Sequence, residues 1–216
     1  MRADSRSSTS RRLVLASTSP YRRELLQRLR LEFDVVAPNV EESPRGDEAP
    51  LALALRLALA KADAASRDDP DAIVIGSDQI AELDGSTLGK PGNHAKATLQ
   101  LQAMRGRRVV FHTAVAVVCA ATGFRSCEVA SVAVTFRALS DADIERYLRA
   151  EQPYDCAGSA KVETLGIALL DSIESDDPTA IVGLPLIRTC ALLRRAGLDP
   201  LASANSAVSS SPEKAP

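Results

Sequence analysis

The 216-residue chain has no tryptophan, and aromatic residues make up only 3% of it. Its core must therefore be built from Leu, Val, Ile and Ala, so each aromatic side chain near a candidate site is informative. No apolar run reaches the roughly 18 residues that a membrane span requires. The opening sequence MRADSRSSTSRR also lacks the apolar segment of a secretory signal. We therefore expect a cytoplasmic protein with no membrane partner.

The sequence also lacks metal-ligand spacing among its cysteines and an excess of positive charge. The four cysteines have no Cys-x-x-Cys spacing, so they are expected to be thiols in a reducing compartment. The 26 Lys and Arg residues are balanced by 28 Asp and Glu residues, which gives a net charge of -2. No global positive field gathers nucleic acid, and any phosphate site must come from a local cluster.

The common phosphate-binding loops are absent. No Gly-x-Gly-x-x-Gly follows the first expected strand. In GSTLGKP the glycines are too close for a P-loop, and Pro91 follows the lysine where Ser or Thr is needed. The metalloprotease, nucleophile-elbow and kinase signatures are also missing. These absences exclude the widespread nucleotide-binding motifs, although they leave a less familiar site open.

Composition and patterning predict one folded domain. Residues 1–11 and 202–216 are polar without apolar periodicity, so we expect a disordered lead and tail around a single domain at 12–201. Helices are expected from Pro20 and at 51–66, 94–105, 140–150 and 185–196. Strands are expected at 13–16, 33–37, 72–76 with an extension at 80–83, 108–120, 127–137, 156–159 and 165–170. Helices and strands alternate at first, and a hairpin then interrupts them. The pattern predicts an α/β fold with a mixed sheet and flanking helices.

The segment ASTSPYRRE lies where the first strand turns into the first helix. Ser19 is a good N-cap, and Pro20 suits the first helical position. Free N–H groups at a helix start favour phosphate, and arginines add bidentate contacts. The turn is thus a candidate anion site, although plain capping with solvated arginines also accounts for it.

An acid follows the strand AIVIG in the segment GSDQ. Asp78 at the end of a buried strand can hold a metal or act as a base, or it can cap a turn. Glu41, Lys61 and Lys90, each taken alone, are consistent with ordinary solvated side chains. The order of the segments carries more information than any one of them.

The ordered set ASTSPYRREL, EE, LALAKA, GSDQ, GKP, CAGSAKVE and VGLPL resembles the Maf family of nucleoside triphosphate pyrophosphatases. The resemblance covers about residues 12–200. It implies a fold related to that of the inosine triphosphatases, with two lobes around a central cleft, and a homodimer. It also implies hydrolysis of a nucleotide substrate to a monophosphate and pyrophosphate, assisted by Mg²⁺ or Mn²⁺.

The resemblance assigns a role to each matching residue. Asp78 matches the proton acceptor and a metal ligand, and Glu41 matches the acid that helps to hold the cation. The phosphate-binding positions are Ser17, Ser19, Arg22, Arg23, Lys61 and Lys90.

Three positions resemble those that select the base. Tyr21, Gln79 and Glu163 are similar to the residues of relatives directed to 7-methyl-GTP, whose base is a cation. Tyr21 could stack on that ring, and Glu163 could accept hydrogen bonds from it. The alternatives are UTP, dTTP or another noncanonical nucleotide, or a regulator of septum formation that only binds nucleotide.

Overall fold

A computed structural model describes residues 11–202 of the chain, so the tails expected at 1–11 and 202–216 lie almost wholly outside the described residues. The described part contains a seven-stranded sheet in the order β2-β1-β3-β5-β6-β7, with β4 paired to β3. In chain order the strands are β1 (Leu13–Ala16), β2 (Asp34–Val36), β3 (Ile73–Leu83), β4 (Ser86–Leu88), β5 (Arg108–Cys119), β6 (Phe124–Phe136) and β7 (Leu170–Glu174).

The sheet is mixed, as the alternation followed by a hairpin predicts. β1 pairs in parallel with β2 and β3, whereas the pairs β3–β5, β5–β6, β6–β7 and β3–β4 are antiparallel. β1, β2 and β3 run parallel because the helix that follows β1, at Pro20–Gln27, and the helix that follows β2, at Pro50–Ser66, each carry the chain back along the sheet. β5 and β6 form a hairpin, whose turn ends at Gly123 in the left-handed conformation with φ 69°.

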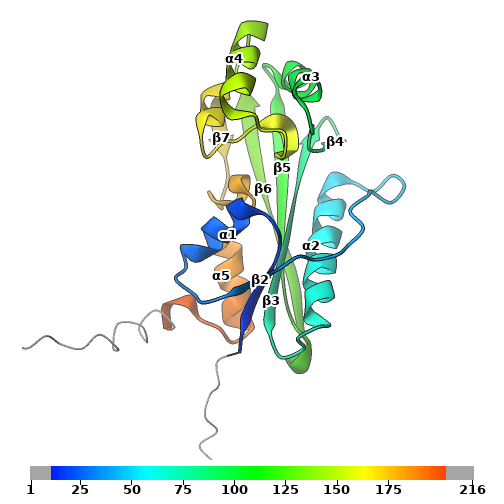
Figure 1. Cartoon of the computed structure of the whole chain (residues 1–216), viewed down its shortest axis with the longest axis vertical. Coiled ribbons are helices and arrows are strands. Elements are labelled where there is room, and N and C mark those ends of the chain that lie inside the picture. Colours follow the sequence, from blue (N-terminus) through cyan, green and yellow to red (C-terminus); the bar gives the residue numbers. More distant parts are fainter. Residues whose placement is uncertain (1–10, 203–216) are drawn as a thin grey trace, which may run out of the picture.

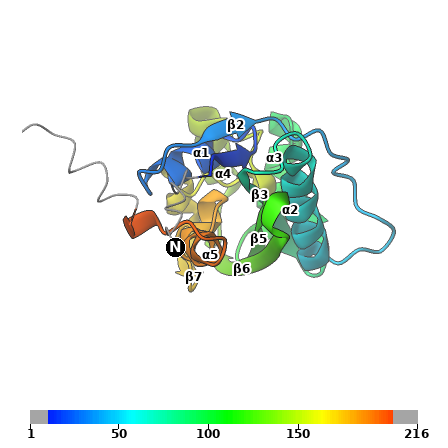
Figure 2. The same cartoon turned by 90° about the horizontal axis from the view of Figure 1, so that it is seen from below.

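Helices cover both faces of the lower half of the sheet (Figure 1). The helices are α1 (Pro20–Gln27), α2 (Pro50–Ser66), α3 (His94–Met104), α4 (Asp141–Glu151) and α5 (Leu186–Arg195). α2 packs on one face, and α1 and α5 lie on the other (Figure 2). Strand β3 is therefore buried on both faces, which explains its unbroken apolar start, Ile73–Ile75.

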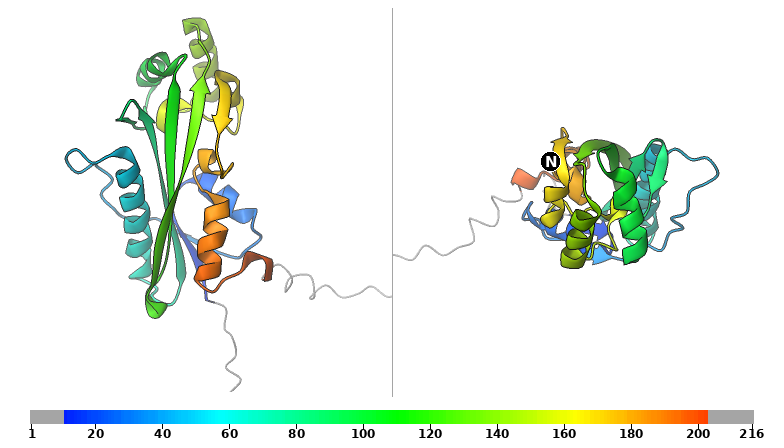
Figure 3. Two further views of the ribbon diagram at one scale, coloured as in Figure 1. Left: turned by 180° about the vertical axis from the view of Figure 1, so that it is seen from behind. Right: turned by 90° about the horizontal axis from the view of Figure 1, so that it is seen from above.

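The upper half has a separate core. The long strands β5 and β6 extend beyond α2 and pack against α3 and α4 (Figure 3). α4 begins at the expected capping site, where Ser140 and Asp143 form a capping box. The two halves correspond to the two lobes that the resemblance implies.

Gly76 explains how closely α2 lies on the sheet. A Cβ atom at this position would lie 2.3 Å from the carbonyl oxygen of Ala58 and 2.5 Å from the backbone nitrogen of Ala62. Only glycine permits that approach. As a result, the helix residue Lys61 reaches the strand residue Asp78.

Several expected strands differ in the structure. The strands predicted at 156–159 and 165–170 are wrong, because Ala157–Ser159 and Leu165–Leu169 form 3-10 turns. Gly158 and Ser159 have φ values of 68° and 55°, which are incompatible with an extended chain. β4 and β7 were not predicted, since both are short and mostly exposed and give no alternating pattern. In the described residues, no helix is long and apolar enough to cross a membrane.

Candidate active site

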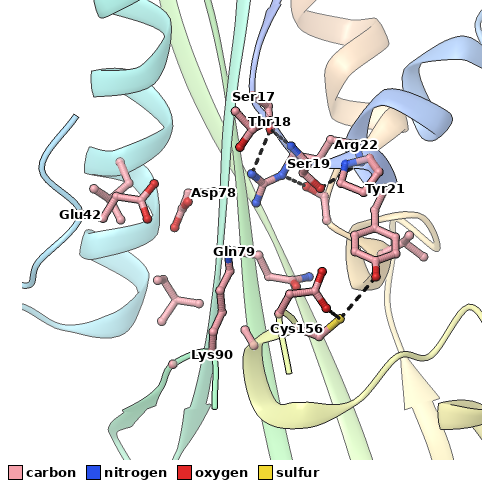
Figure 4. Close-up of a pocket in the computed structure, with 18 of the residues that line it drawn as sticks. Ser17, Thr18, Ser19, Tyr21, Arg22, Glu42, Asp78, Gln79, Lys90 and Cys156 are labelled. Carbon is pink, nitrogen blue, oxygen red and sulfur yellow. Dashed lines mark hydrogen bonds between the residues drawn. The ribbon is translucent and has the colours of Figure 1, made fainter. Parts of the chain in front are cut away.

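A cavity of about 510 Å³ lies between the two halves of the molecule. Its walls come from the β1–α1 turn, α2, β3, the loop after β4 and the segment 155–163 (Figure 4). This volume lies within the usual range of small-molecule sites. Most of the residues singled out in the sequence line it: Ser17, Ser19, Tyr21, Arg22, Lys61, Asp78, Gln79, Lys90 and Glu163.

Arg23 and Glu41 do not line this cavity. Arg23 is exposed on the other side of α1 and borders a surface groove with Gln27 and Phe33. Successive helix residues point about 100° apart, so Arg22 and Arg23 cannot both face the cavity. Glu41 is also exposed, and its carboxylate accepts a hydrogen bond from the Ser43 backbone N–H at 2.9 Å. Hydrogen bonds from Ser43 hold the pKa of Glu41 below its ordinary value.

Glu42, and not its neighbour Glu41, borders the cavity. Its carboxylate lies 2.7 Å from the Lys61 ammonium and borders the cavity. Burial raises the pKa of Glu42, but the hydrogen bond and charge of Lys61 and the charges of Lys90 and Arg22 outweigh it and lower the pKa. The sequence offered two adjacent acids and no signal to choose between them.

Lys61 joins two carboxylates. Its Nζ donates to Asp78 Oδ1 at 2.6 Å and also contacts Glu42. The side chains of Lys61 and Asp78 are only 7% and 11% exposed. A charge pair this deep is strong only when its geometry is good, and removal of one partner leaves the other buried and uncompensated.

Asp78 is accessible because β1 ends early. The last paired residue of β1 is Ala16, which lies opposite Gly76. The chain then turns away through Ser17 into α1 and leaves the next part of β3 open on that side. Asp78 thus sits just beyond the carboxyl end of a parallel strand, where ligands gather in α/β sheets.

The β1–α1 turn is held by its own side chains. Ser17 Oγ accepts from the Ser19 N–H at 3.2 Å, and Ser19 Oγ accepts from the Arg22 N–H at 3.4 Å. Arg22 Nε donates to the Gly183 carbonyl at 2.8 Å, which ties the turn to the segment before α5. Burial lowers the pKa of Arg22, while the charges of Asp78 and Glu42 oppose that effect.

Two of the cations that line the cavity make no ion pair in the described part of the chain. Within residues 11–202, neither Arg22 nor Lys90 forms an ion pair with a carboxylate. Lys90 extends from the wall opposite Ser17 toward the middle of the cavity (Figure 4). We call the part of the cavity around Ser17, Arg22, Lys61, Asp78 and Lys90 the basic end. It is suited to a polyanion.

The other part of the cavity, around Tyr21, Gln79, Asp155, Cys156 and Glu163, is the tyrosine end. Gln79 Nε2 donates toward Thr113 Oγ1 and the carbonyls of Ala180 and Ile181 at 2.9–3.0 Å. Three acceptors around one nitrogen fix which way the amide points. The Gln79 oxygen is therefore the atom left to meet a ligand.

Lys161 covers one face of the Tyr21 ring. The Lys161 ammonium lies 5.6 Å from the centroid of its ring, and Lys161 does not line the cavity. The Cys156 thiol donates to the Tyr21 hydroxyl at 3.9 Å. Burial, together with the charges of Cys156, Asp155 and Glu163, raises the pKa of Tyr21. One face of the ring is occupied, so only the opposite face is available for a base.

Two carboxylates border the tyrosine end. Burial raises the pKa of Glu163, although the charge of Lys161 partly offsets it. Asp155 was not singled out in the sequence, nor was Cys156, whose pKa burial raises to about 12. Cys156 begins the segment CAGSAKVE and Asp155 directly precedes it, so that segment was the available signal for this wall.

Comparison with known proteins identifies the family of the chain. The family model described as Maf-like protein matches residues 12–196. The chain belongs to this family. It is 65% identical over 188 residues to a protein of Albidiferax ferrireducens (strain ATCC BAA-621 / DSM 15236 / T118) named 7-methyl-GTP pyrophosphatase, covering 87% of this chain and 94% of that relative. It is 59% identical over 189 residues to a protein of the same name from Burkholderia pseudomallei (strain K96243), covering 86% and 88%.

A solved structure also resembles the chain, more distantly. The Staphylococcus aureus Ham1 protein is 16% identical, with a TM-score of 0.44 and coverage of 59% of this chain and 73% of that one.

Proposed function

We propose that the protein hydrolyses a nucleoside triphosphate to a monophosphate and pyrophosphate, and that 7-methyl-GTP is its preferred substrate. The observation that carries the proposal is the division of the cavity. A buried carboxylate, paired with Lys61, shares the basic end with Arg22 and Lys90, while an aromatic ring with two carboxylates lies at the tyrosine end. The relatives named 7-methyl-GTP pyrophosphatase, up to 65% identical, support the same substrate.

At the basic end, Asp78 would act as the general base. It accepts a proton from water while the water oxygen bonds to the α-phosphorus. The α–β phosphoanhydride P–O bond breaks, and its electron pair leaves with pyrophosphate. Arg22, Lys61 and Lys90 would neutralise the charge on that leaving group, which is the main electrostatic demand of the reaction. Lys61 also orients the Asp78 carboxylate through their 2.6 Å hydrogen bond.

The carboxylates at the basic end fit a divalent cation that arrives with substrate. Among residues 11–202, no group of three His, Cys, Asp or Glu side chains could hold a metal. Mg²⁺ does not need such a cage, because it commonly binds one or two carboxylates together with substrate phosphates. Asp78 and Glu42 already share one cationic partner, Lys61, so both can face a second cation. Glu42 therefore replaces Glu41 as the proposed second ligand, and the ion would offset charge on the triphosphate.

At the tyrosine end, the free face of Tyr21 suits a flat cationic base. Stacking there would contribute roughly 0.5–2 kcal/mol. The Glu163 carboxylate can accept from the ring N–H and amino groups of 7-methylguanine, and a hydrogen bond to a charged acceptor contributes about 1.5–3 kcal/mol. Asp155 adds a second negative charge near the ring. Thymine and uracil offer one imide N–H and no positive charge, so they should be weaker substrates.

The test is a panel of standard and methylated nucleoside triphosphates, scored for pyrophosphate release with and without Mg²⁺ or Mn²⁺. We expect the highest kcat/KM with 7-methyl-GTP and a loss of turnover without the cation. A higher kcat/KM with UTP or dTTP would contradict the substrate assignment. Tight binding with no pyrophosphate from any nucleotide would favour the regulator of septum formation over the enzyme.

The homodimer and the cytoplasmic location expected from the sequence belong to this proposal as well. Sedimentation of the purified protein and fractionation of cells that express it would test them. A monomer at micromolar concentration, or a membrane-associated protein, would contradict these two expectations respectively.

A further inference from the structure

The lysine loop, Gly89–Gly92, places Lys90 in the cavity but has little structure of its own. It follows β4, a three-residue strand that pairs only with β3 and lies off the main path of the sheet. Gly89 and Lys90 are themselves exposed. Pairing of β4 alone is thus a weak constraint on where the Lys90 ammonium lies.

Gln100 on α3 connects this loop to the opposite wall of the cavity. Its Nε2 donates to the Gly89 carbonyl at 3.0 Å, and its Oε1 accepts from Ser159 Oγ at 2.6 Å. Gln100 does not line the cavity, so it does not touch a ligand there. One amide group therefore joins the residue before Lys90 to the wall that carries Ala157 and Ala160.

The Ser159 end of this connection is rigid and strained. Ser159 is fully buried, and its φ of 55° is unusual for a residue with a side chain. Such conformations persist only where the surrounding structure holds them, and they cluster at functional sites. The Ser159 backbone N–H also bonds to the Cys156 carbonyl, which anchors the wall of the tyrosine end.

A second set of contacts, to Tyr154, holds the lysine loop in place when the hydrogen bonds of Gln100 are removed. The Gly92 N–H donates to the Tyr154 carbonyl at 2.9 Å, and His94 Nδ1 lies 3.0 Å from the Tyr154 hydroxyl. Removal of the Gln100 side chain should therefore loosen the lysine loop without unfolding the protein.

We propose that Gln100 is a positioning residue, which fixes the Lys90 ammonium relative to the tyrosine end and so sets the distance between phosphate and base recognition. The inference rests on the proposed function, because it assumes that Lys90 contacts the triphosphate. Gln100 acts through Lys90 and takes no part in the chemistry.

Two substitutions test the connection. Gln100→Ala removes both hydrogen bonds. Gln100→Glu keeps the shape and the bond from Ser159 but sets a carboxylate oxygen against the Gly89 carbonyl. Because small misplacements of a binding group have large kinetic effects, we expect each change to lower kcat/KM about 10-fold, mainly through KM. Retention of full activity by Gln100→Glu would show that only packing matters and would overturn the proposal.

Gln102→Ala is the matched control. Gln102 lies on the same helix and donates to Asp141 on α4, away from the cavity. Its removal should leave kcat/KM unchanged. An equal loss in both variants would mean that any disturbance of α3 suffices, which would contradict a specific role for Gln100.

The closing experiment is a double-mutant cycle read by calorimetric binding of inorganic tripolyphosphate in Mg²⁺ buffer. Lys90→Ala and Gln100→Ala should each weaken binding, and the double variant should bind no more weakly than Lys90→Ala alone. Additive losses, unchanged binding in Gln100→Ala, or no binding by the wild type would overturn the proposal. Failure of the proposed function would look different, since the cycle would behave as expected while no nucleotide released pyrophosphate.

Discussion

The Asp78–Lys61 pair of the basic end lies on a buried strand and a long helix, whereas the 155–163 wall of the tyrosine end is built from turns. Asp78 and Lys61 come from β3 and α2, which Gly76 allows to lie in close contact. Asp155, Cys156 and Glu163 come from segments around the 3-10 turns after α4. Rigid elements hold reactive groups more precisely than turns do, and turns tolerate change more easily. The difference implies that chemistry is fixed at one end and that base selection is adjustable at the other.

Asp78→Asn should cause the largest loss of activity, and the loss should be in kcat. The amide keeps the shape of the carboxylate but cannot accept the proton, so kcat should fall by about 10²–10⁴-fold. Nucleotide binding should change little, since the amide keeps the shape of the side chain and Lys61 keeps its second carboxylate partner, Glu42. Steady-state kinetics and calorimetric binding on the same preparation measure both quantities. Comparable turnover in the variant would remove Asp78 from the role of base.

Glu163→Gln combined with Tyr21→Arg should change the ranking of substrates at the tyrosine end. Loss of a charged acceptor and a stacking face should lower kcat/KM for 7-methyl-GTP relative to UTP by about 10- to 100-fold. Lys161 lies 5.6 Å from the Tyr21 ring, so the new arginine meets a like charge, and thermal unfolding must be compared with the wild type. An unchanged ranking in a folded double variant would refute the division between the two ends.

Asp155→Asn should cause the smallest loss of kcat/KM, and it tests whether the tyrosine end senses the charge of the base. Asp155 is exposed, and exposed charges interact weakly through water. We expect a selective loss of about two- to fivefold in kcat/KM for 7-methyl-GTP, with GTP unaffected. Asp171→Asn is the control, because it removes an exposed acid on β7 that does not line the cavity. Equal losses for the two nucleotides would mean that the Asp155 charge does not sense the methylated base.

The sequence predicted the regular elements beneath the basic end better than the turns around the tyrosine end, for physical reasons. Continuous apolar runs and a Ser-Pro helix start report buried strands and caps directly, so β1 and α1 follow from local patterns alone. The sequence predicts Asp78 directly after a strand, whereas it lies within β3, which continues to Leu83. The choice of Glu42 over Glu41 depends on how an irregular loop folds against Lys61, which no local pattern encodes. Ser159 has a left-handed backbone conformation, so the segment 156–159, where the sequence predicts a strand, forms a turn. The contacts of Gln100 and Gln79 join residues far apart in the chain, and only the tertiary structure reveals them.

The central claim is that this cavity cleaves a triphosphate between its α and β phosphates. Phosphorus NMR of 7-methyl-GTP incubated with the wild-type protein and Mg²⁺ tests it most directly. The account predicts 7-methyl-GMP and pyrophosphate in equal amounts, and neither signal with Asp78→Asn on the same time scale. Orthophosphate together with 7-methyl-GDP as the first products, or equal product from the Asp78 variant, would contradict it.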